Sequence, residues 1–164
     1  MNLADTNILG TFARVERLEL LLELFGQGEL GVCPAVYAEL LAGVRECRGF
    51  LQAAIRQIEG GRIKLLALDA DEIVRREKLP LSLDSGEAES ITICQARGAA
   101  FLTNDRRARN FCLEEGLNVF DLPDILRALW KLHVCSKRQA RQVVAEIESK
   151  EGMVLKHKER IFAK

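Results

Sequence analysis

The chain has 164 residues, 48% hydrophobic and 29% charged, and its 24 basic and 24 acidic side chains give a formal net charge of zero. This length suits one domain with a single core, and the zero net charge offers no global electrostatic argument for nucleic-acid binding. We expect no signal peptide, no membrane-spanning segment and a cytoplasmic location. Five cysteines without a C-x-x-C pair predict free thiols rather than a disulfide framework or a zinc cluster.

The first half of the chain alternates short apolar runs with helical periods. Strands are predicted at residues 1–4, 30–33 and 62–68. Helices are predicted directly after Asp5, from Val15 to Phe25, from Pro34 through Val44, from Phe50 to Ile58, and after a cap at Asp69.

The second half continues the same alternation. Helices are predicted from Gly86 to Gly98, over 106–115, around 125–130, and after a cap at Ser136. Strands are predicted at 99–102 and 117–120. Strand–helix alternation favours an α/β fold in which helices cover a central parallel sheet.

Charge divides the chain into two parts. Residues 136–164 hold eight Lys or Arg and four Glu, a balance of +4, so the first 135 residues carry −4. We therefore predict a main domain at 1–135 and a helical, basic extension at 136–164 packed on the same domain. An anionic partner and a solvated terminal helix both account for the basic extension.

Four acidic residues lie close to predicted helix starts, and they are Asp5, Glu39, Glu87 and Asp105. Each has an ordinary structural explanation, as a helix cap or a solvated flank. The carboxyl ends of parallel strands, however, share one edge of a sheet, where open α/β folds place their sites. Grouped carboxylates without Cys or His suit Mg²⁺ or Mn²⁺ rather than zinc.

Other polar residues flank these acids. Supporting oxygens or amides are expected from Asn7, Thr103 and Asn104. Glu89 competes with Glu87 for the third acidic position, but two helical residues this far apart, roughly 200° round the axis, do not face one point. Arg106, Arg107 and Arg109 are candidates for RNA phosphate contacts, or form a solvated helix face.

Four segments together resemble a PIN domain, the metal-dependent nuclease fold that includes VapC-type toxins. Leu3-Ala4-Asp5-Thr6-Asn7 is similar to that family's opening strand with its first acid. The segments 34–40, 86–91 and 102–105 resemble those that carry the second, third and fourth acids, the third in the GEAE-type variant. The resemblance covers about residues 1–130, and the remainder looks like the helical ending of the GEAE-bearing subgroup.

The resemblance implies a three-layer sandwich with a central parallel sheet flanked by helices. It implies an Mg²⁺- or Mn²⁺-dependent endoribonuclease in which Asp5, Glu39, Glu87 and Asp105 are both catalytic and metal-binding. Such ions would activate water and neutralise charge on the scissile phosphate. The family also implies that the protein is the toxin of a toxin–antitoxin pair, with a protein antitoxin and a homodimer.

Three alternatives compete with this interpretation. A PIN-like domain that is not a toxin could process RNA in a housekeeping assembly, or bind RNA without cutting it. A haloacid-dehalogenase-type phosphatase needs an Asp two residues after its nucleophile, and Asn7 occupies that place. A receiver-like signalling domain needs a Lys after its last strand, which residues 117–122 do not provide.

Overall fold

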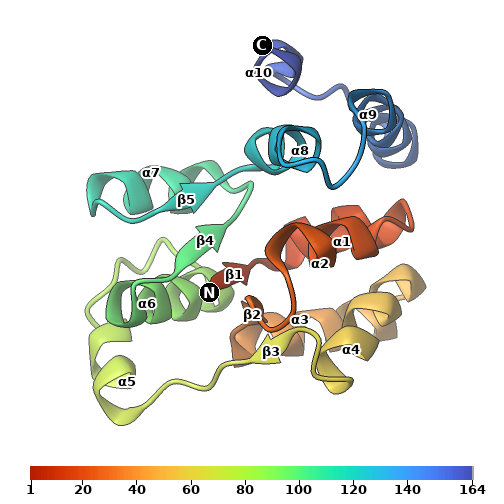
Figure 1. Ribbon diagram of the computed structural model, residues 1–164. Helices are drawn as coiled ribbons and strands as arrows, with labels where there is room; N and C mark the ends of the chain where they lie inside the picture. Colours follow the sequence, from red (N-terminus) through yellow and green to blue (C-terminus); the bar gives the residue numbers. More distant parts are fainter. Residues whose placement is uncertain (164) are drawn as a thin grey trace.

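The computed structural model describes residues 1–163, whose strands form one five-stranded sheet in the order β3-β2-β1-β4-β5 (Figure 1). The strands are β1 (Asn2–Ala4), β2 (Leu30–Val32), β3 (Lys64–Leu65), β4 (Ala100–Leu102) and β5 (Val119–Phe120). Each neighbouring pair is parallel, and β1 lies at the centre, pairing with both β2 and β4. All five carboxyl ends therefore meet at one edge of the sheet.

Helices cover both faces of this sheet. Those of the first half are α1 (Thr6–Arg14), α2 (Leu18–Phe25), α3 (Pro34–Arg45), the 3-10 helix η1 (Gly49–Leu51), α4 (Gln52–Glu59) and α5 (Ala70–Arg76). Those of the second half are α6 (Ser85–Arg97), α7 (Arg106–Glu114), α8 (Leu122–Lys131), α9 (Lys137–Glu151) and α10 (Lys158–Phe162). Figure 1 shows α5, α6 and α7 to the left of the sheet and α1, α2, α4 and α8 to its right. The predicted α/β fold with a helix-flanked parallel sheet is confirmed.

Short polar side chains start several of these helices. Asp69, Asp84 and Ser136 each accept a hydrogen bond from the backbone three residues on, and the third helical residue bonds back to the cap. These reciprocal pairs are capping boxes, which satisfy amide hydrogens left free by the helix start. The caps predicted at Asp69 and Ser136 are confirmed. Gly98 ends α6 in the left-handed conformation, with φ 66°.

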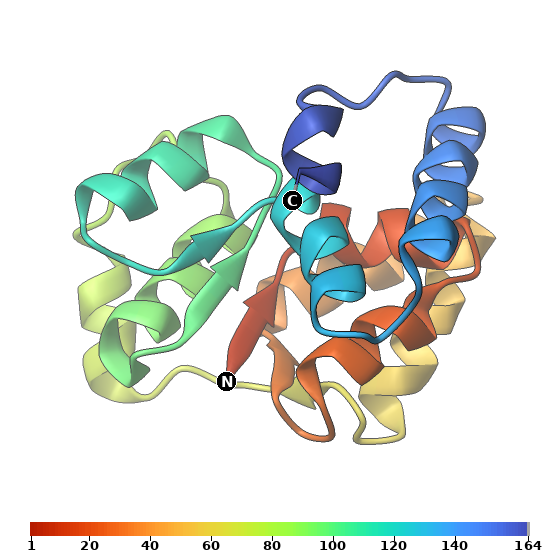
Figure 2. The ribbon, with the colours of Figure 1, turned by 45° about the horizontal axis from the view of Figure 1, so that its top comes forward.

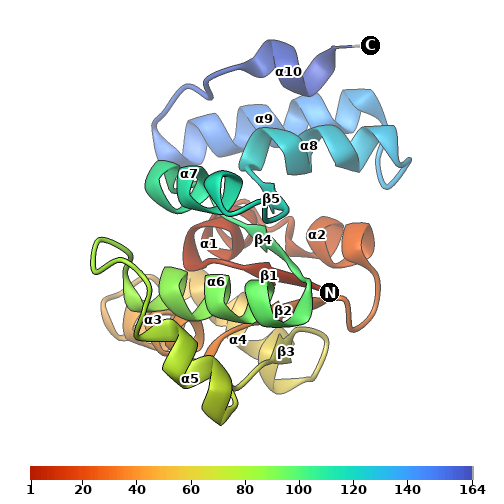
Figure 3. The same ribbon diagram turned by 90° about the vertical axis from the view of Figure 1, so that its left-hand side faces the viewer.

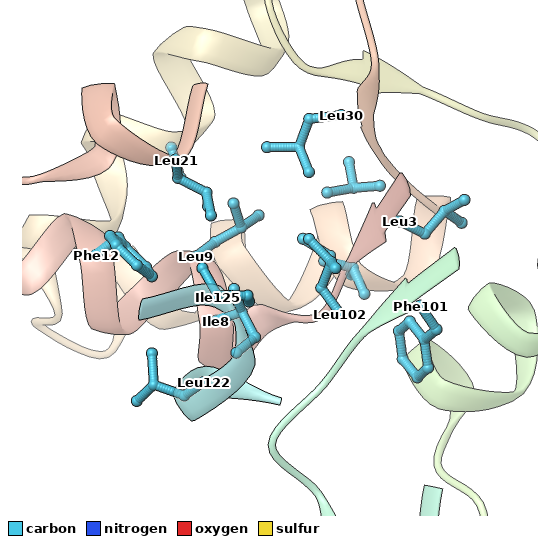
Figure 4. Close-up of a cluster of buried hydrophobic side chains, with 14 of the residues drawn as sticks. Leu3, Ile8, Leu9, Phe12, Leu21, Leu30, Phe101, Leu102, Leu122 and Ile125 are labelled. Carbon is cyan, nitrogen blue, oxygen red and sulfur yellow. The ribbon is translucent and has the colours of Figure 1, made fainter. Parts of the chain in front are cut away.

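The centre of the core lies around β1 and its neighbours (Figure 4). Leu3, Leu30, Phe101 and Leu102 are fully buried. Strands covered on both faces read as continuous apolar runs rather than alternating ones. Burial of these strands on both faces fixes the positions of the residues that follow them at the carboxyl edge of the sheet.

Two sequence predictions were wrong in detail. The helix predicted from Val15 to Phe25 is present as α2 but begins only at Leu18, because the chain turns at Glu16, whose φ of 57° lies in the left-handed region. The strand expected over 62–68 is only Lys64–Leu65, and both residues are exposed. As the edge strand, β3 pairs with β2 alone, so it lacks a second neighbour that would extend it.

The C-terminal helices pack on the rest of the chain (Figure 3). Helix α9 contacts α1 and α8, and α10, which the sequence did not predict, contacts α8. Arg17 and Glu146 form an ion pair at 2.8 Å, and the Trp130 indole N–H donates to the Ile161 carbonyl at 2.8 Å. A division of the chain at residue 135 remains a prediction. Lys164 lies outside the described residues.

The remaining general expectations concern membranes and thiols. No helix within residues 1–163 is long and apolar enough to cross a membrane. The five cysteines are all free thiols, four of them buried and Cys47 exposed.

Candidate active site

Asp5 follows β1 directly and caps α1. Its Oδ1 accepts a hydrogen bond from the backbone N–H of Ile8 at 2.7 Å, and its Oδ2 accepts one from the Thr103 hydroxyl at 2.6 Å. The residue is only 7% exposed. Burial raises the pKa of the Asp5 carboxyl to about 6, against the lowering effect of these hydrogen bonds, and Glu39 adds a further small increase. Asp5 is therefore a fixed carboxylate whose charge is poorly compensated.

Glu39 reaches the same place from α3. Its Oε2 accepts a hydrogen bond from the hydroxyl of Thr6, the first residue of α1. Burial raises the pKa of Glu39, and the negative charges of Asp84 and Glu89 add to this effect, while the Thr6 bond opposes it. Helix α6 can approach because residue 86 is a glycine: a Cβ there would lie 2.9 Å from Glu39 Oε1.

Glu87 and Glu89 occupy the first turns of α6 but face different neighbours. Glu87 Oε2 accepts from the backbone N–H of Asp84 at 3.0 Å, completing the capping box. Burial raises the pKa of Glu87 to about 7, and the charges of Asp84 and Asp105 contribute. Glu89 instead accepts from the Ala35 backbone N–H at 2.9 Å, at the start of α3. The structure therefore places the two glutamates apart, as the helical period requires.

Three of the four predicted acids line one cleft. This acidic cleft, of about 380 Å³, is bordered by Asp5, Glu39 and Glu87, together with Thr6, Asn7 and Asp84. The acids come from the end of β1, from α3 and from α6, so only the folded chain brings them together. Their assignment as catalytic residues and metal ligands remains a prediction.

Asp105 borders a second, adjoining cleft of about 280 Å³. It caps α7, because its Oδ1 accepts from the backbone N–H groups of Arg107 at 2.8 Å and Ala108 at 3.0 Å. Thr6 and Asn7 line both clefts, so Asp105 stands at the border of the acidic group. The charge of Asp105 nevertheless reaches Glu87, whose pKa it raises.

The predicted supporting residues have different surroundings. Thr103 is buried and holds Asp5, whereas the Asn104 side-chain oxygen accepts from the Leu122 backbone N–H at 3.4 Å, at the start of α8. The three arginines predicted to contact RNA also lie in different surroundings. Arg107 is exposed, and its positive charge lowers the pKa of Glu87. Arg106 and Arg109 line a third cleft on the other side of Asn104.

Two basic residues at the site were missed. Arg14 and Arg48 both line the second cleft, which we call the arginine cleft, and Arg48 lines the acidic cleft as well. The Arg14 guanidinium lies over the Phe50 ring, 4.4 Å from its centroid. Asn7, Gly10 and Arg14 recur at helical spacing on α1, a signal that could have revealed Arg14. Arg48 had no comparable signal, because it lies in the loop after α3.

The donor set suits a hard divalent cation. The acidic cleft offers carboxylate, hydroxyl and amide oxygens, the ligands that Mg²⁺ and Mn²⁺ prefer. Burial raises the pKa of each of its three predicted acids, so a cation there would relieve an unfavourable concentration of charge. Among residues 1–163 no three acidic, imidazole or thiol groups already converge on one point.

Comparison of the sequence with models of known protein families finds one match. A family model described as a PIN domain matches residues 1–160, which include all five strands and nearly all of the C-terminal helices. No curated protein matches the chain closely enough to count as a relative.

Proposed function

Since the chain belongs to the PIN domain family, whose members are in general nucleases that use divalent metals, we propose that it is an Mg²⁺- or Mn²⁺-dependent endoribonuclease. The observation that carries this proposal is the acidic cleft, where Asp5, Glu39 and Glu87 approach from three separate elements. Ordinary helix caps need no such convergence. Asp105, which lines the adjoining arginine cleft, is the fourth residue of the proposed site.

The proposed roles follow from the contacts. Asp5, Glu39 and Glu87 would hold the ion, with Asp105 beside them. A divalent ion bound there stabilises the negative charge that develops on a phosphodiester and favours deprotonation of the attacking water. Thr103 and the Ile8 amide keep the Asp5 oxygens in place, and Thr6 does the same for Glu39.

Basic side chains beside the acids supply the complementary charge that a polyanionic substrate needs. Arg14 and Arg48 line the arginine cleft, and Arg107 lies near Glu87. Contacts of this kind, from guanidinium to phosphate, position a nucleic acid without reading its sequence. We therefore place the RNA backbone along the border of the acidic cleft, with the scissile phosphate towards Asp5.

We further propose that the protein is the toxin of a toxin–antitoxin pair and acts as a homodimer. This proposal rests on the family resemblance of the GEAE-type segment at the start of α6. An acidic cleft of this kind would attract a basic segment of a protein antitoxin, because opposite charges steer association. Co-expression with the neighbouring open reading frame, followed by co-purification and a growth assay, tests the toxin role.

Mn²⁺ calorimetry with wild type and Asp5→Asn, with a labelled RNA incubated in parallel, tests the nuclease. Asn keeps an oxygen that can cap α1, so the fold should survive while one ligand charge is removed. Asp69→Asn, which alters the cap of α5 in the same way, is the matched control. We expect loss of Mn²⁺ binding and of cleavage in Asp5→Asn alone.

Other outcomes discriminate among the alternatives. Unchanged Mn²⁺ affinity and cleavage in Asp5→Asn would overturn the site assignment. RNA binding by the wild type without Mn²⁺ binding would instead identify a PIN-like domain that binds RNA and does not cut it.

A further inference from the structure

We propose that residues 153–160, together with the first turn of α7, form a binding cleft for unpaired nucleotides of the RNA on one side of the scissile phosphate. This inference rests on the proposed function, because it extends the substrate path away from the acidic cleft. It assigns the C-terminal segment between α9 and α10 a direct part in substrate binding.

The cleft has a volume of about 430 Å³ and is lined by Asn104, Arg106, Met153, Val154, Lys156 and His157, among others. Asn104 also lines the arginine cleft, where it neighbours Asp105. The three clefts therefore adjoin one another: the acidic and arginine clefts share Thr6, Asn7 and Arg48, and the arginine cleft shares Asn104 with this C-terminal cleft. Figure 2 shows the segment before α10 arching from α9 towards α7.

Charges in the C-terminal cleft fall into two groups. Arg109 and Arg160 are engaged by acids at the start of α8: Arg109 lies 3.4 Å and Arg160 3.3 Å from Asp121, and Arg160 lies 2.7 Å from Asp124. Arg106 and Lys156 form no ion pair with any residue in 1–163. The charges of Arg109 and Arg160 are neutralised by these acids, and the ion pairs hold the wall of the C-terminal cleft in place. Arg106 and Lys156 remain available to contact phosphates.

The segment that carries Lys156 is anchored rather than loose. The Leu155 side chain is 5% exposed, and its backbone N–H donates to Glu148 Oε1 at 2.8 Å. Lys158 Nζ lies 2.9 Å from the same Glu148 oxygen. These contacts tie both neighbours of Lys156 to Glu148 of α9, so the backbone that carries Lys156 is held at the wall of the cleft.

Apolar side chains beside the two cations indicate single-stranded rather than duplex RNA. Val154 is 73% exposed and Met153 is 37% exposed, and both line the cleft. A duplex presents phosphates and sugars on its outside and would leave these side chains in water. An unpaired strand presents base faces that can cover apolar surface while its phosphates meet the cations.

The test is RNA binding without cleavage, by fluorescence anisotropy of a labelled, unstructured RNA with the full chain in EDTA. The double variant Arg106→Ala with Lys156→Ala is compared with Arg138→Ala with Lys150→Ala, two exposed basic residues that line none of the three clefts. Both variants remove two positive charges. We expect about tenfold weaker binding for the first, and a salt dependence reduced by about 1.4 logarithmic units per decade, because two phosphate contacts are lost.

Three further measurements bear on the outcome. Mn²⁺ affinity by calorimetry should be unchanged in the Arg106/Lys156 variant, and duplex RNA should bind more weakly than the single strand to wild type. Single-stranded DNA should show the same loss, because the cleft contacts phosphates and bases. Equal weakening in both double variants, no weakening in either, or a preference for duplex RNA would each overturn the proposal. Because this experiment measures RNA binding and not cleavage, its result can be interpreted even if the protein proves not to be a nuclease.

Discussion

Thr103 donates its hydroxyl hydrogen to Asp5 Oδ2 at 2.6 Å, although 98 positions separate the two residues. The contact exists because β1 and β4 are neighbours in the sheet, with Ala4 paired to Leu102. Each residue lies at or just beyond the end of its strand. Thr103 also accepts a hydrogen bond from the Asp105 backbone N–H at 3.1 Å, so one hydroxyl connects the first and fourth predicted acids.

Replacing Thr103 with Val should weaken Mn²⁺ binding at neutral pH. Loss of the donor leaves the Asp5 carboxylate less stabilised, so its pKa should rise further above about 6 and protons should compete better with the metal. We expect about tenfold lower affinity at pH 6.5, partly restored at pH 8. Thr92→Val is the control, because the Thr92 hydroxyl is buried but bonds to the Ala88 carbonyl within α6. An equal effect in both variants would contradict the assignment.

The substitutions Glu87→Gln and Glu89→Gln should have very different effects on RNA cleavage. Glu87 borders the acidic cleft with Asp5, whereas Glu89 accepts from the backbone at the start of α3. Glutamine can keep either backbone contact while removing the charge. We expect cleavage to fall on the order of 100-fold in Glu87→Gln and by only a small factor in Glu89→Gln. Single-turnover cleavage of a labelled RNA measures both, and the reverse order would make Glu89 the third acid.

Gly86→Ala should disturb Glu39 without unfolding α6. The new Cβ would lie 2.9 Å from Glu39 Oε1 and 3.1 Å from Val36 Cγ2, so Glu39 must move. Overpacking of this kind costs about 1–3 kcal/mol, and we expect Mn²⁺ affinity to fall about tenfold. Gly49→Ala is the control, because a Cβ there meets no atom within 4 Å. Calorimetry and a thermal melt separate the loss of affinity from a loss of fold.

Without metal, stability should decrease as pH rises from about 4 to about 7. The pKa values of Asp5 and Glu87 are raised to about 6 and about 7 in the folded protein, so the folded state binds more protons than the unfolded state in this range. By linkage, the free energy of unfolding falls as pH rises through these values, and Asp5 alone accounts for about 3 kcal/mol. Urea unfolding in EDTA measures this dependence.

The Asp5→Asn variant is the control for this pH dependence of the free energy of unfolding. It should flatten the decrease, because residue 5 no longer titrates, and Mn²⁺ should stabilise the wild type most at higher pH. A wild-type stability that increases from pH 4 to pH 7 in EDTA would contradict the raised pKa values.

Much of the fold was predictable because its signals are local. Apolar runs marked the strands near Leu3, Leu30 and Phe101, and the capping residues Asp69 and Ser136 marked helix starts. The start of α2 was predicted three residues too early, because Val15 lies at helical spacing from Leu18 and Leu22. The length of β3 was also missed, since an edge position is a property of the sheet and not of the strand.

For the site, the sequence by itself determined which oxygen-bearing residues follow the strands and begin the helices, because caps and strand ends depend on nearby residues. Only the tertiary structure decided their grouping: Asp5, Glu39 and Glu87 share a cleft, while Asp105 lines the adjoining arginine cleft. It also placed Arg106 in the C-terminal cleft and brought Arg48 beside the acids. These outcomes depend on parallel strand pairing and helix packing over long sequence separations, which local spacing does not encode.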